Sequence, residues 1–187
     1  MKIVLVSRFP EDIDRPHGGV ETATVALARA LLDAGVEKLY IIALERDLNT
    51  NLKYEVYEGI HVHRLPRSFC PMILDVFFGP STFRLNEYIH RLSPDVVHFQ
   101  ETWGFGARRC KFPSVFTVHG FDSLNLPTEQ AKFWKLRAYL QGMAEKIGLS
   151  AQTHVISIAP YVRKKLRCLL RLKFMISGAL WMKNTFS

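Results

Sequence analysis

Two adjacent glycines, Gly18 and Gly19, stand at the start of a segment whose apolar residues recur at helical spacing from Val20 to Ala34. The apolar run 3–6 before them is typical of a buried strand. Glycines at a helix start carry no Cβ atoms that would keep a ligand away, and the first N–H groups of a helix have no partner within it. This arrangement suits an anion such as a phosphate or diphosphate. The simpler interpretation is that the pair only lets the loop turn tightly into the helix.

A histidine, His119, is the candidate for catalysis. It directly follows the predicted strand 114–118 and precedes Gly120. An imidazole titrates close to neutral pH, so it can hydrogen-bond a substrate or assist a proton transfer. The alternative interpretation is a histidine that closes the end of a strand through its own hydrogen bonds.

Four further residues near predicted strand ends are weaker candidates for substrate binding: His98, Glu101, Trp103 and Asp122. In an open parallel sheet the ligand crevice lies outside the carboxyl ends of the strands, where these residues gather. For His98, a buried or edge position without a binding role explains the residue equally well. For Trp103, the alternative is an anchor that holds its loop against the core.

The elements that position these residues alternate between strand and helix. Strands are predicted at 3–6, 39–44, 60–65, 95–99, 114–118 and 154–158, and helices at 20–34, 80–92, 127–147 and 159–167. Short apolar strands that alternate with helices require a parallel sheet covered on both faces. The predicted fold class is therefore α/β, a Rossmann-like doubly wound sheet. A length of 187 residues is sufficient for one such domain.

The net charge of +8 is concentrated at the end of the chain. Residues 1–145 carry 17 acidic and 17 basic side chains, whereas residues 146–187 carry eight basic side chains and no acidic one. A neutral body offers no basic groove to a phosphate backbone, so nucleic acid is not an expected partner. The basic side chains around 163–167, with their neighbouring leucines, leave two interpretations: peripheral contact with an anionic membrane, or a solvated helix face.

Cysteine and histidine usage argues against a disulfide framework and a metal site. Three widely spaced cysteines indicate a reducing compartment. They are Cys70, Cys110 and Cys168. His61 and His63 share one side of a predicted strand, but no third ligand lies near them in sequence, so we expect ordinary surface residues. Glu45 lies at the end of the second predicted strand, where a dinucleotide-binding fold has the acidic residue that binds ribose. The glycines, however, come too late after the first strand for a nicotinamide-binding motif.

Several short motifs follow one another in a characteristic order. They are Gly-Gly-Val-Glu, Tyr-Glu-Gly-Ile-His-Val, Ser-Pro-Asp-Val-Val-His-Phe, Val-Phe-Thr-Val-His-Gly-Phe-Asp and His-Val-Ile-Ser-Ile-Ala-Pro-Tyr-Val. In this order they resemble the N-terminal domain of the family 4 glycosyltransferases. The resemblance covers residues 1–167 and implies the N-terminal, acceptor-side half of the two-domain GT-B architecture of retaining enzymes.

The resemblance implies transfer of a sugar from a nucleotide-diphosphate sugar to an acceptor, which is a glycan, a lipid-linked sugar or a small molecule. It implies that Gly18 and Gly19 contribute backbone amides to the donor diphosphate, where fixed N–H groups stabilise the leaving charge. His119 matches the family histidine beside the transferred sugar. No metal and no cofactor other than the donor substrate are expected.

The tail at 168–187 departs from the family pattern, because family members continue here into a second domain that holds the nucleotide. The tail is hydrophobic and basic without clear periodicity. We expect a frameshifted or premature end in preference to a single-domain relative whose donor domain is a separate partner chain. A non-catalytic binding or interaction module is the alternative function. The expected location is cytoplasmic, with a peripheral place at the cytoplasmic membrane face as the weaker alternative.

Overall fold

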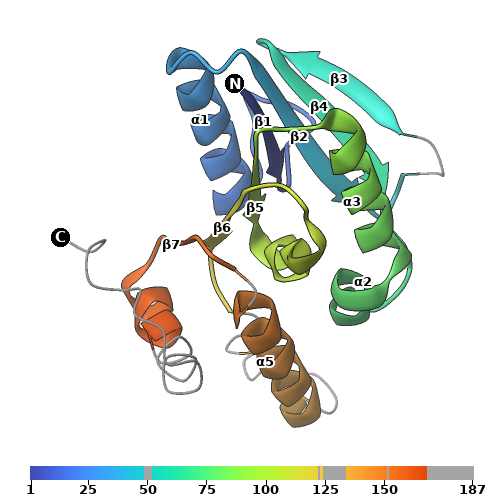
Figure 1. Ribbon diagram of the computed structural model, residues 1–187, viewed down its shortest axis with the longest axis vertical. Coiled ribbons are helices and arrows are strands. Elements are labelled where there is room, and N and C mark those ends of the chain that lie inside the picture. The colour runs from blue at the N-terminus through green and yellow to red at the C-terminus, as the bar shows by residue number, and fades with distance from the viewer. Residues whose placement is uncertain (49–51, 122, 124–133, 151, 168–187) are drawn as a thin grey trace.

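The computed structural model describes residues 1–48, 52–121, 123, 134–150 and 152–167, and it confirms the α/β fold (Figure 1). A seven-stranded sheet has the order β3-β4-β2-β1-β5-β6-β7. Neighbouring strands pair in parallel except β3, which pairs antiparallel with β4. The strands are β1 (Lys2–Val6), β2 (Lys38–Glu45), β3 (Lys53–Tyr57), β4 (Ile60–Pro66), β5 (Val96–Gln100), β6 (Ser114–Val118) and β7 (Val155–Ser157).

Helices cover both faces of the sheet, as the apolar strands require. The described elements are α1 (Gly19–Asp33), α2 (Met72–Phe78), α3 (Pro80–Leu92), the 3₁₀ helix η1 (Glu101–Arg109) and α5 (Trp134–Ser150). Residues 160–167 are also helical. In Figure 1, α1 lies on one side of the central strands, while α2 and α3 lie together on the other side. None of the helices in these described ranges is long and apolar enough to cross a bilayer.

Two core clusters separate the faces, because successive residues of a strand point to opposite sides. On one face, α1 packs Val25 and Ala28 against alternate residues of the central strands, including Leu5 and Ile41. On the other face, a larger cluster joins strand residues such as Phe116 to side chains from α2, α3, η1 and α5. The sheet therefore separates two faces that are covered by different helices.

β1 occupies the point where the direction of strand order reverses. From β1 the chain first proceeds to β2 on one side, and β5 later pairs with the other side of β1. In open α/β sheets the ligand crevice lies at such a point, outside the carboxyl ends of the strands. The segments that follow β1 and β5 are thus the ones that the fold places for binding.

Three elements were not predicted: β3, α2 and η1. β3 is an edge strand that begins with two exposed residues, Lys53 and Tyr54, so it lacks the apolar run of the central strands. η1 contains Gly104, where an added Cβ would lie 2.0 Å from the Phe116 ring. This close approach requires glycine, which sequence periodicity does not reveal. The predicted helix 127–147 begins at Trp134 among the described residues.

The expectation that His61 and His63 are ordinary surface residues is wrong for His63, which is only 5% exposed. Its Nδ1 hydrogen-bonds the Tyr88 hydroxyl at 2.7 Å, and the ring lies edge-on to the Tyr40 and Tyr54 rings. Burial, and then the neighbouring His61, lower the pKa of His63. The histidine pair belongs to a packed aromatic cluster between the sheet and α3.

A buried arginine, Arg64, ties β4 to the loop that follows β1. Its side chain is 2% exposed and donates to the carbonyls of Phe9 at 3.0 Å and Pro10 at 2.6 Å. It also pairs with Glu55 at 2.8 Å and with Glu45. Burial acts to lower the pKa of Arg64, but the bonds to these two carboxylates leave it raised. The network fixes the start of the segment that leads to the glycine pair.

Replacing Arg64 with methionine should lower the free energy of unfolding by about 3–5 kcal/mol, because it leaves two partly buried carboxylates and two carbonyl groups without their partner. Urea denaturation followed by circular dichroism measures this loss. The matched control is Arg91→Met on α3, where the side chain is 68% exposed, and this change should cost at most about 1 kcal/mol. Equal losses in the two variants would contradict the role of the Arg64 network.

Candidate functional site

The first turn of α1 presents an open helix start. Gly18 is the N-cap with φ +87°, a left-handed conformation that favours glycine, and no side chain caps the helix. A Cβ added at Gly18 or Gly19 would meet no atom of the described chain within 4 Å. The Glu21 carboxylate accepts the backbone N–H of His17 at 2.7 Å. The glycine pair therefore faces space that an external group can enter.

A buried pair of hydroxyls fixes α1 to the end of β1. Thr24 is fully buried, and its hydroxyl donates to the Val20 carbonyl at 2.8 Å within the helix. Because a threonine hydroxyl has one proton, the 2.8 Å contact between Thr24 Oγ1 and Ser7 Oγ is donated by Ser7. Ser7 directly follows β1, so this bond places the first turns of α1 beside the carboxyl edge of the sheet.

His119 lies at the same edge, held by a glutamine. Its Nε2 is 2.8 Å from Oε1 of Gln100, the last residue of β5, which is only 2% exposed. An amide oxygen only accepts, so His119 donates through Nε2. A neutral imidazole with that proton carries its lone pair on Nδ1. Gln100 thus selects the tautomer and the orientation of His119.

A second histidine, His98, makes a similar side-chain contact between β5 and β6. Its Nε2 is 2.7 Å from the Thr117 hydroxyl of β6. Val97 and Phe99 belong to the core on the side away from α1, so strand alternation directs His98 and Gln100 to the face that α1 covers. The two contacts make a polar row across β5 and β6.

The polar row is continuous with the start of α1. The register that pairs β1 with β5 makes Ser7 the edge neighbour of Gln100. Gln100 bonds His119, and Ser7 bonds Thr24 of α1. The glycine-led helix start and His119 therefore share one edge and one face of the sheet.

Both histidines of this row are shifted toward the neutral form. Burial lowers the pKa of His119 below the ordinary value of 6.5. Burial, followed by the nearby His119, also lowers the pKa of His98. At neutral pH the row therefore offers uncharged imidazoles, which can accept a proton or share a hydrogen bond.

A buried carboxylate holds the segment that follows His119. Glu145 of α5 is fully buried and accepts the Ser123 N–H at 2.9 Å and its hydroxyl at 2.6 Å. Lys165 donates to the same carboxylate at 3.1 Å, and its ammonium lies 4.0 Å from the centre of the Phe121 ring. The helices that precede and follow β7 in the chain, α5 and 160–167, thereby restrain the strand end that carries His119.

The chain matches the family model for Glycosyltransferase Family 4 over residues 17–174, a range that includes the glycine pair and His119. The chain belongs to glycosyltransferase family 4. It is 28% identical over 139 residues to the GDP-mannose-dependent alpha-mannosyltransferase of Mycobacterium tuberculosis (strain CDC 1551 / Oshkosh). That alignment covers 68% of this chain and 36% of the relative, so the chain spans about a third of the relative's length.

Solved structures with the same fold are GT-B glycosyltransferases. Sucrose-phosphate synthase from Thermosynechococcus elongatus superposes with a TM-score of 0.56 at 16% identity, covering 89% of this chain and 81% of that one. The Escherichia coli trehalose-6-phosphate structure bound with UDP-2-fluoro glucose superposes with a TM-score of 0.54 at 14% identity, covering 92% of this chain and 43% of that one. At these identities the likeness establishes the fold, the Rossmann-like half of a GT-B protein.

Within this family domain, the weaker predicted residues occupy different surroundings. Glu101 begins η1 with φ +56° and pairs with Arg8 at 3.3 Å at the sheet edge. Trp103 is 6% exposed within the larger core, which favours the anchoring interpretation, although it also lines a small cavity. Asp122 lies outside the described residues. The structure thus groups His98 with His119 and sets Glu101 and Trp103 on the η1 side.

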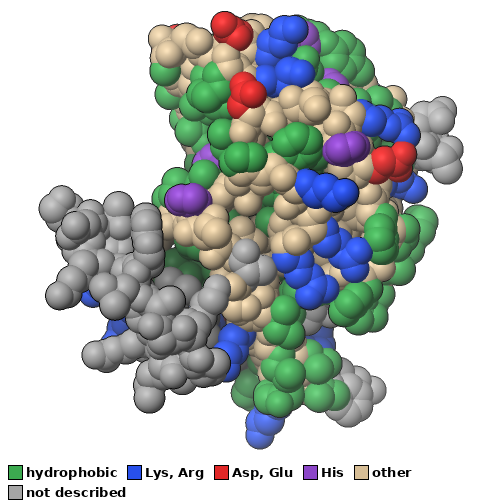
Figure 2. All heavy atoms as spheres, in the orientation of Figure 1, with side chains coloured by type: hydrophobic (Ala, Val, Ile, Leu, Met, Phe, Trp, Pro, Cys, Tyr) green, Lys and Arg blue, Asp and Glu red, His purple; other side chains and the backbone are tan. Residues whose placement is uncertain are grey.

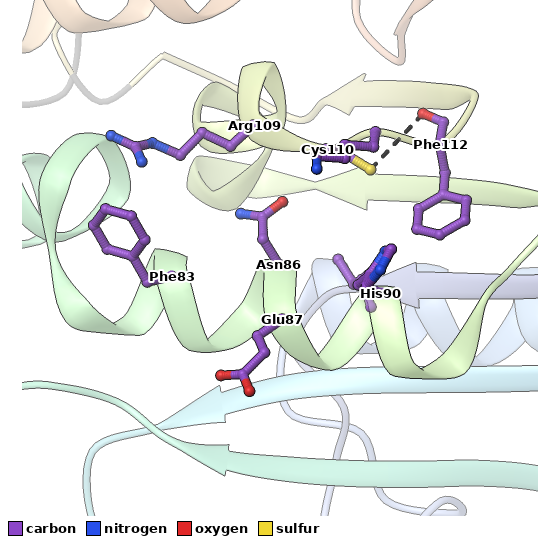
Figure 3. Close-up of a pocket in the computed structure, with 9 residues that line it drawn as sticks. Phe83, Asn86, Glu87, His90, Arg109, Cys110 and Phe112 are labelled. Carbon is purple, nitrogen blue, oxygen red and sulfur yellow. Dashed lines mark hydrogen bonds between the residues drawn. The ribbon is translucent and has the colours of Figure 1, made fainter.

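A larger cavity lies away from this row. It has a volume of about 270 Å³ and lies between α3 and the segment 109–112, with Asn86, His90 and Cys110 among its lining residues (Figure 3). α3 packs on the face opposite α1, so this cavity does not share the face of His119. Among the described ranges, His, Cys, Asp and Glu form no group of three that could hold a metal ion.

Several site residues lacked an individual prediction. Gln100 directly follows the predicted strand 95–99, Arg8 comes two residues after the predicted strand 3–6, and Arg67 directly follows β4. The same strand-end rule applies to all three, but it does not tell which side chain is buried or which neighbour it meets.

On the face seen in Figure 2, basic side chains lie in several separate groups among apolar and neutral ones.

We expect His98 and His119 to titrate below pH 6.5, because burial disfavours the charged imidazole. NMR titration of the imidazole protons, assigned with His98→Gln and His119→Gln, measures both midpoints. His119→Gln should raise the midpoint of His98 by removing a neighbouring charge. Since the folded state prefers the neutral rings, their contribution to stability is present above pH 6.5 and is lost as the pH falls below it. A His119 midpoint above 6.5 would contradict this description.

Proposed function

We propose that this chain is the N-terminal, acceptor-side domain of a retaining glycosyltransferase that uses a nucleotide-diphosphate sugar. The observation that carries the proposal is the placement of the open α1 start and His119 on one edge and one face of the sheet. Membership of glycosyltransferase family 4 supports the transferase class. The identity of the sugar and of the acceptor is left open by this observation.

In this proposal the α1 start binds the diphosphate of the donor. The first N–H groups of a helix have no partner within it, and the partial positive charge of that end favours an anion. When the bond between sugar and phosphate breaks, negative charge grows on the leaving diphosphate. N–H groups that are already oriented stabilise that charge without reorganising. Gly18 and Gly19 allow the phosphate oxygens to approach because no Cβ occupies that space.

His119 acts in this proposal on the sugar or on the incoming hydroxyl. Its Nε2 proton is engaged by Gln100, so the Nδ1 lone pair is the site that can accept a hydrogen bond or a proton. The lowered pKa keeps the ring neutral near pH 7, which suits an acceptor role. Gln100 serves as the positioning residue for this ring.

The proposed enzyme requires a second, donor-holding domain. The chain spans 36% of its mannosyltransferase relative, and that relative is described as GDP-mannose-dependent. We propose that the rest of the donor site is supplied by a further domain or by a partner chain. The proposal involves no metal and no cofactor other than the donor substrate, and a reducing cytosol is the compartment that it favours. Contact with an anionic membrane remains part of the proposal for a lipid-linked acceptor.

Gly19→Ala should weaken binding of UDP and GDP to this domain about tenfold or more, because a methyl group would enter the space at the helix start and displace charge-assisted hydrogen bonds. Isothermal titration calorimetry measures the affinity. The matched control is Gly142→Ala on α5, where the nearest atom to an added Cβ is at an ordinary contact distance of 3.9 Å. Circular dichroism should show both variants folded, and unchanged affinity in Gly19→Ala would count against the diphosphate site.

His119→Ala should reduce sugar transfer by about a hundredfold or more while nucleotide affinity stays near normal, because the loss is in acid–base or transition-state contacts. The assay uses the chain together with a donor-domain protein and follows release of nucleoside diphosphate. Thr153→Ala, an exposed threonine before β7, is the control. Near-normal turnover of His119→Ala would remove the catalytic role.

The alternative is a binding module that keeps the fold without catalysis. If the wild-type chain with a donor-domain protein binds UDP or GDP but transfers no sugar from any tested donor, the module is favoured over the enzyme half.

A further inference from the structure

A small cavity lies at the carboxyl ends of the central strands, beside the row that carries His119. Its volume is about 50 Å³, and since roughly 10–15 Å³ is enough for one water, it accommodates a group of several heavy atoms. The lining residues are Ser7, Arg8, Leu44, Arg67, Glu101, Thr102 and Trp103. Leu44 and Trp103 pack with the core on the face away from α1. The cavity is therefore distinct from the α1 start, although Ser7 touches both.

Arg67, on this cavity, is a mostly buried cation whose guanidinium lies over the Trp103 ring, 5.9 Å from its centre. Its side chain is 12% exposed, and its Nε and Nη2 atoms are buried with no hydrogen-bond partner in the described part of the chain. The fully buried Asp75 carboxylate forms an ion pair with Arg67, but its Oδ2 atom lies 4.0 Å from Nε, too far for a hydrogen bond. A buried guanidinium nitrogen without a hydrogen bond is costly, and the long ion pair with Asp75 does not supply one, so the group favours a further acceptor.

Two more arginines approach Arg67 from neighbouring strand ends. Arg8 follows β1 and Arg46 follows β2, and both are exposed. Burial lowers the pKa of Arg67, and the charges of Arg46 and Arg8 lower it further, while Asp75 opposes them. Arg8 is 70% exposed and pairs with Glu101 at 3.3 Å. Positive charge from three parallel strands therefore converges at one corner of the sheet edge.

We propose that this cavity is a subsite for an oxyanion, a phosphate or carboxylate group carried by the acceptor substrate. The proposal rests on the proposed function, because it names the acceptor class of that domain. A planar guanidinium with several donors matches an oxyanion in geometry and charge, whereas a sugar hydroxyl offers it only a single neutral acceptor. Glu45, the last residue of β2, is already engaged by buried Arg64. The reacting hydroxyl of an acceptor anchored here would extend toward Gln100 and His119 along the same edge.

The first experiment measures binding of inorganic phosphate to the purified chain by NMR. Phosphate should shift the Nε–H resonance of Arg67, which is assigned from its loss in Arg67→Gln. Arg67→Gln should weaken phosphate binding about tenfold or more, because it removes charge-assisted hydrogen bonds. Arg8→Gln should weaken it by a smaller factor. Arg91→Gln on α3, distant from this strand edge, is the control and should leave the affinity unchanged.

The second experiment distinguishes the two sources of the oxyanion. Glucose 6-phosphate and glucuronate are titrated beside neutral glucose, and preference for one of the two anions identifies the group. Binding of glucose that equals both anions, or phosphate affinity that Arg67→Gln leaves unchanged, would overturn the proposal. If Arg67→Gln unfolds, Arg67→Lys tests the same prediction, because it keeps the charge but loses the planar guanidinium. It should retain only part of the phosphate affinity. Full phosphate affinity in both Arg67→Lys and Arg8→Gln would overturn the subsite.

Gly19→Ala separates this inference from the diphosphate site. Phosphate that binds at Arg67 should be unaffected by Gly19→Ala, whereas UDP binding should be weakened by Gly19→Ala and not by Arg67→Gln. Loss of phosphate binding in Gly19→Ala alone would overturn the arginine subsite while it supports the diphosphate site. Loss in Arg67→Gln alone, with UDP binding unaffected by Gly19→Ala, would support the oxyanion subsite and count against the diphosphate site.

Discussion

Parallel pairing of β1 with both β2 and β5 is the constraint on which this molecule depends. Parallel strands end at the same edge, so every segment that leaves a strand there is brought beside its neighbour's segment. The hydroxyl pair of Ser7 and Thr24 then attaches α1 to that edge, and the Gln100–His119 contact joins the next strands. Sheet register brings the strand ends of the candidate site together, and the hydroxyl pair adds the start of α1 to them.

Much of the fold could be predicted because its central strands are apolar and short. Most apolar residues of β1, β2, β5 and β6 are buried, on both faces of the sheet, and such runs stand out in a sequence. β3 could not be recognised, since an edge strand with exposed lysine and tyrosine lacks that signature. η1 depends on Gly104 meeting the Phe116 ring, a contact between segments that local patterns do not contain.

The candidate site divides in the same way. Gly18, Gly19 and His119 could be selected from their types and their places after strands, and the fold sets them on one edge. The partners that tune them could not be selected. Whether His119 meets Gln100 depends on register between β5 and β6, and burial of Arg67 depends on how α2 and η1 close over β4. Residue type indicates chemistry, whereas the surrounding packing sets charge state and orientation.

Two kinds of polar group thus occupy one edge on opposite sides of the sheet. On the α1 side lie helix N–H groups and neutral histidines, and on the η1 side lie arginines with a buried guanidinium. Anions favour both places, but a helix start offers partial charge in open space, whereas Arg67 offers full charge in a cavity. If both proposed sites are occupied, the ends of β1 and β5, marked by Ser7 and Gln100, lie between the two ligands. The sugar would then be transferred from donor to acceptor across these strand ends, where Gln100 holds His119.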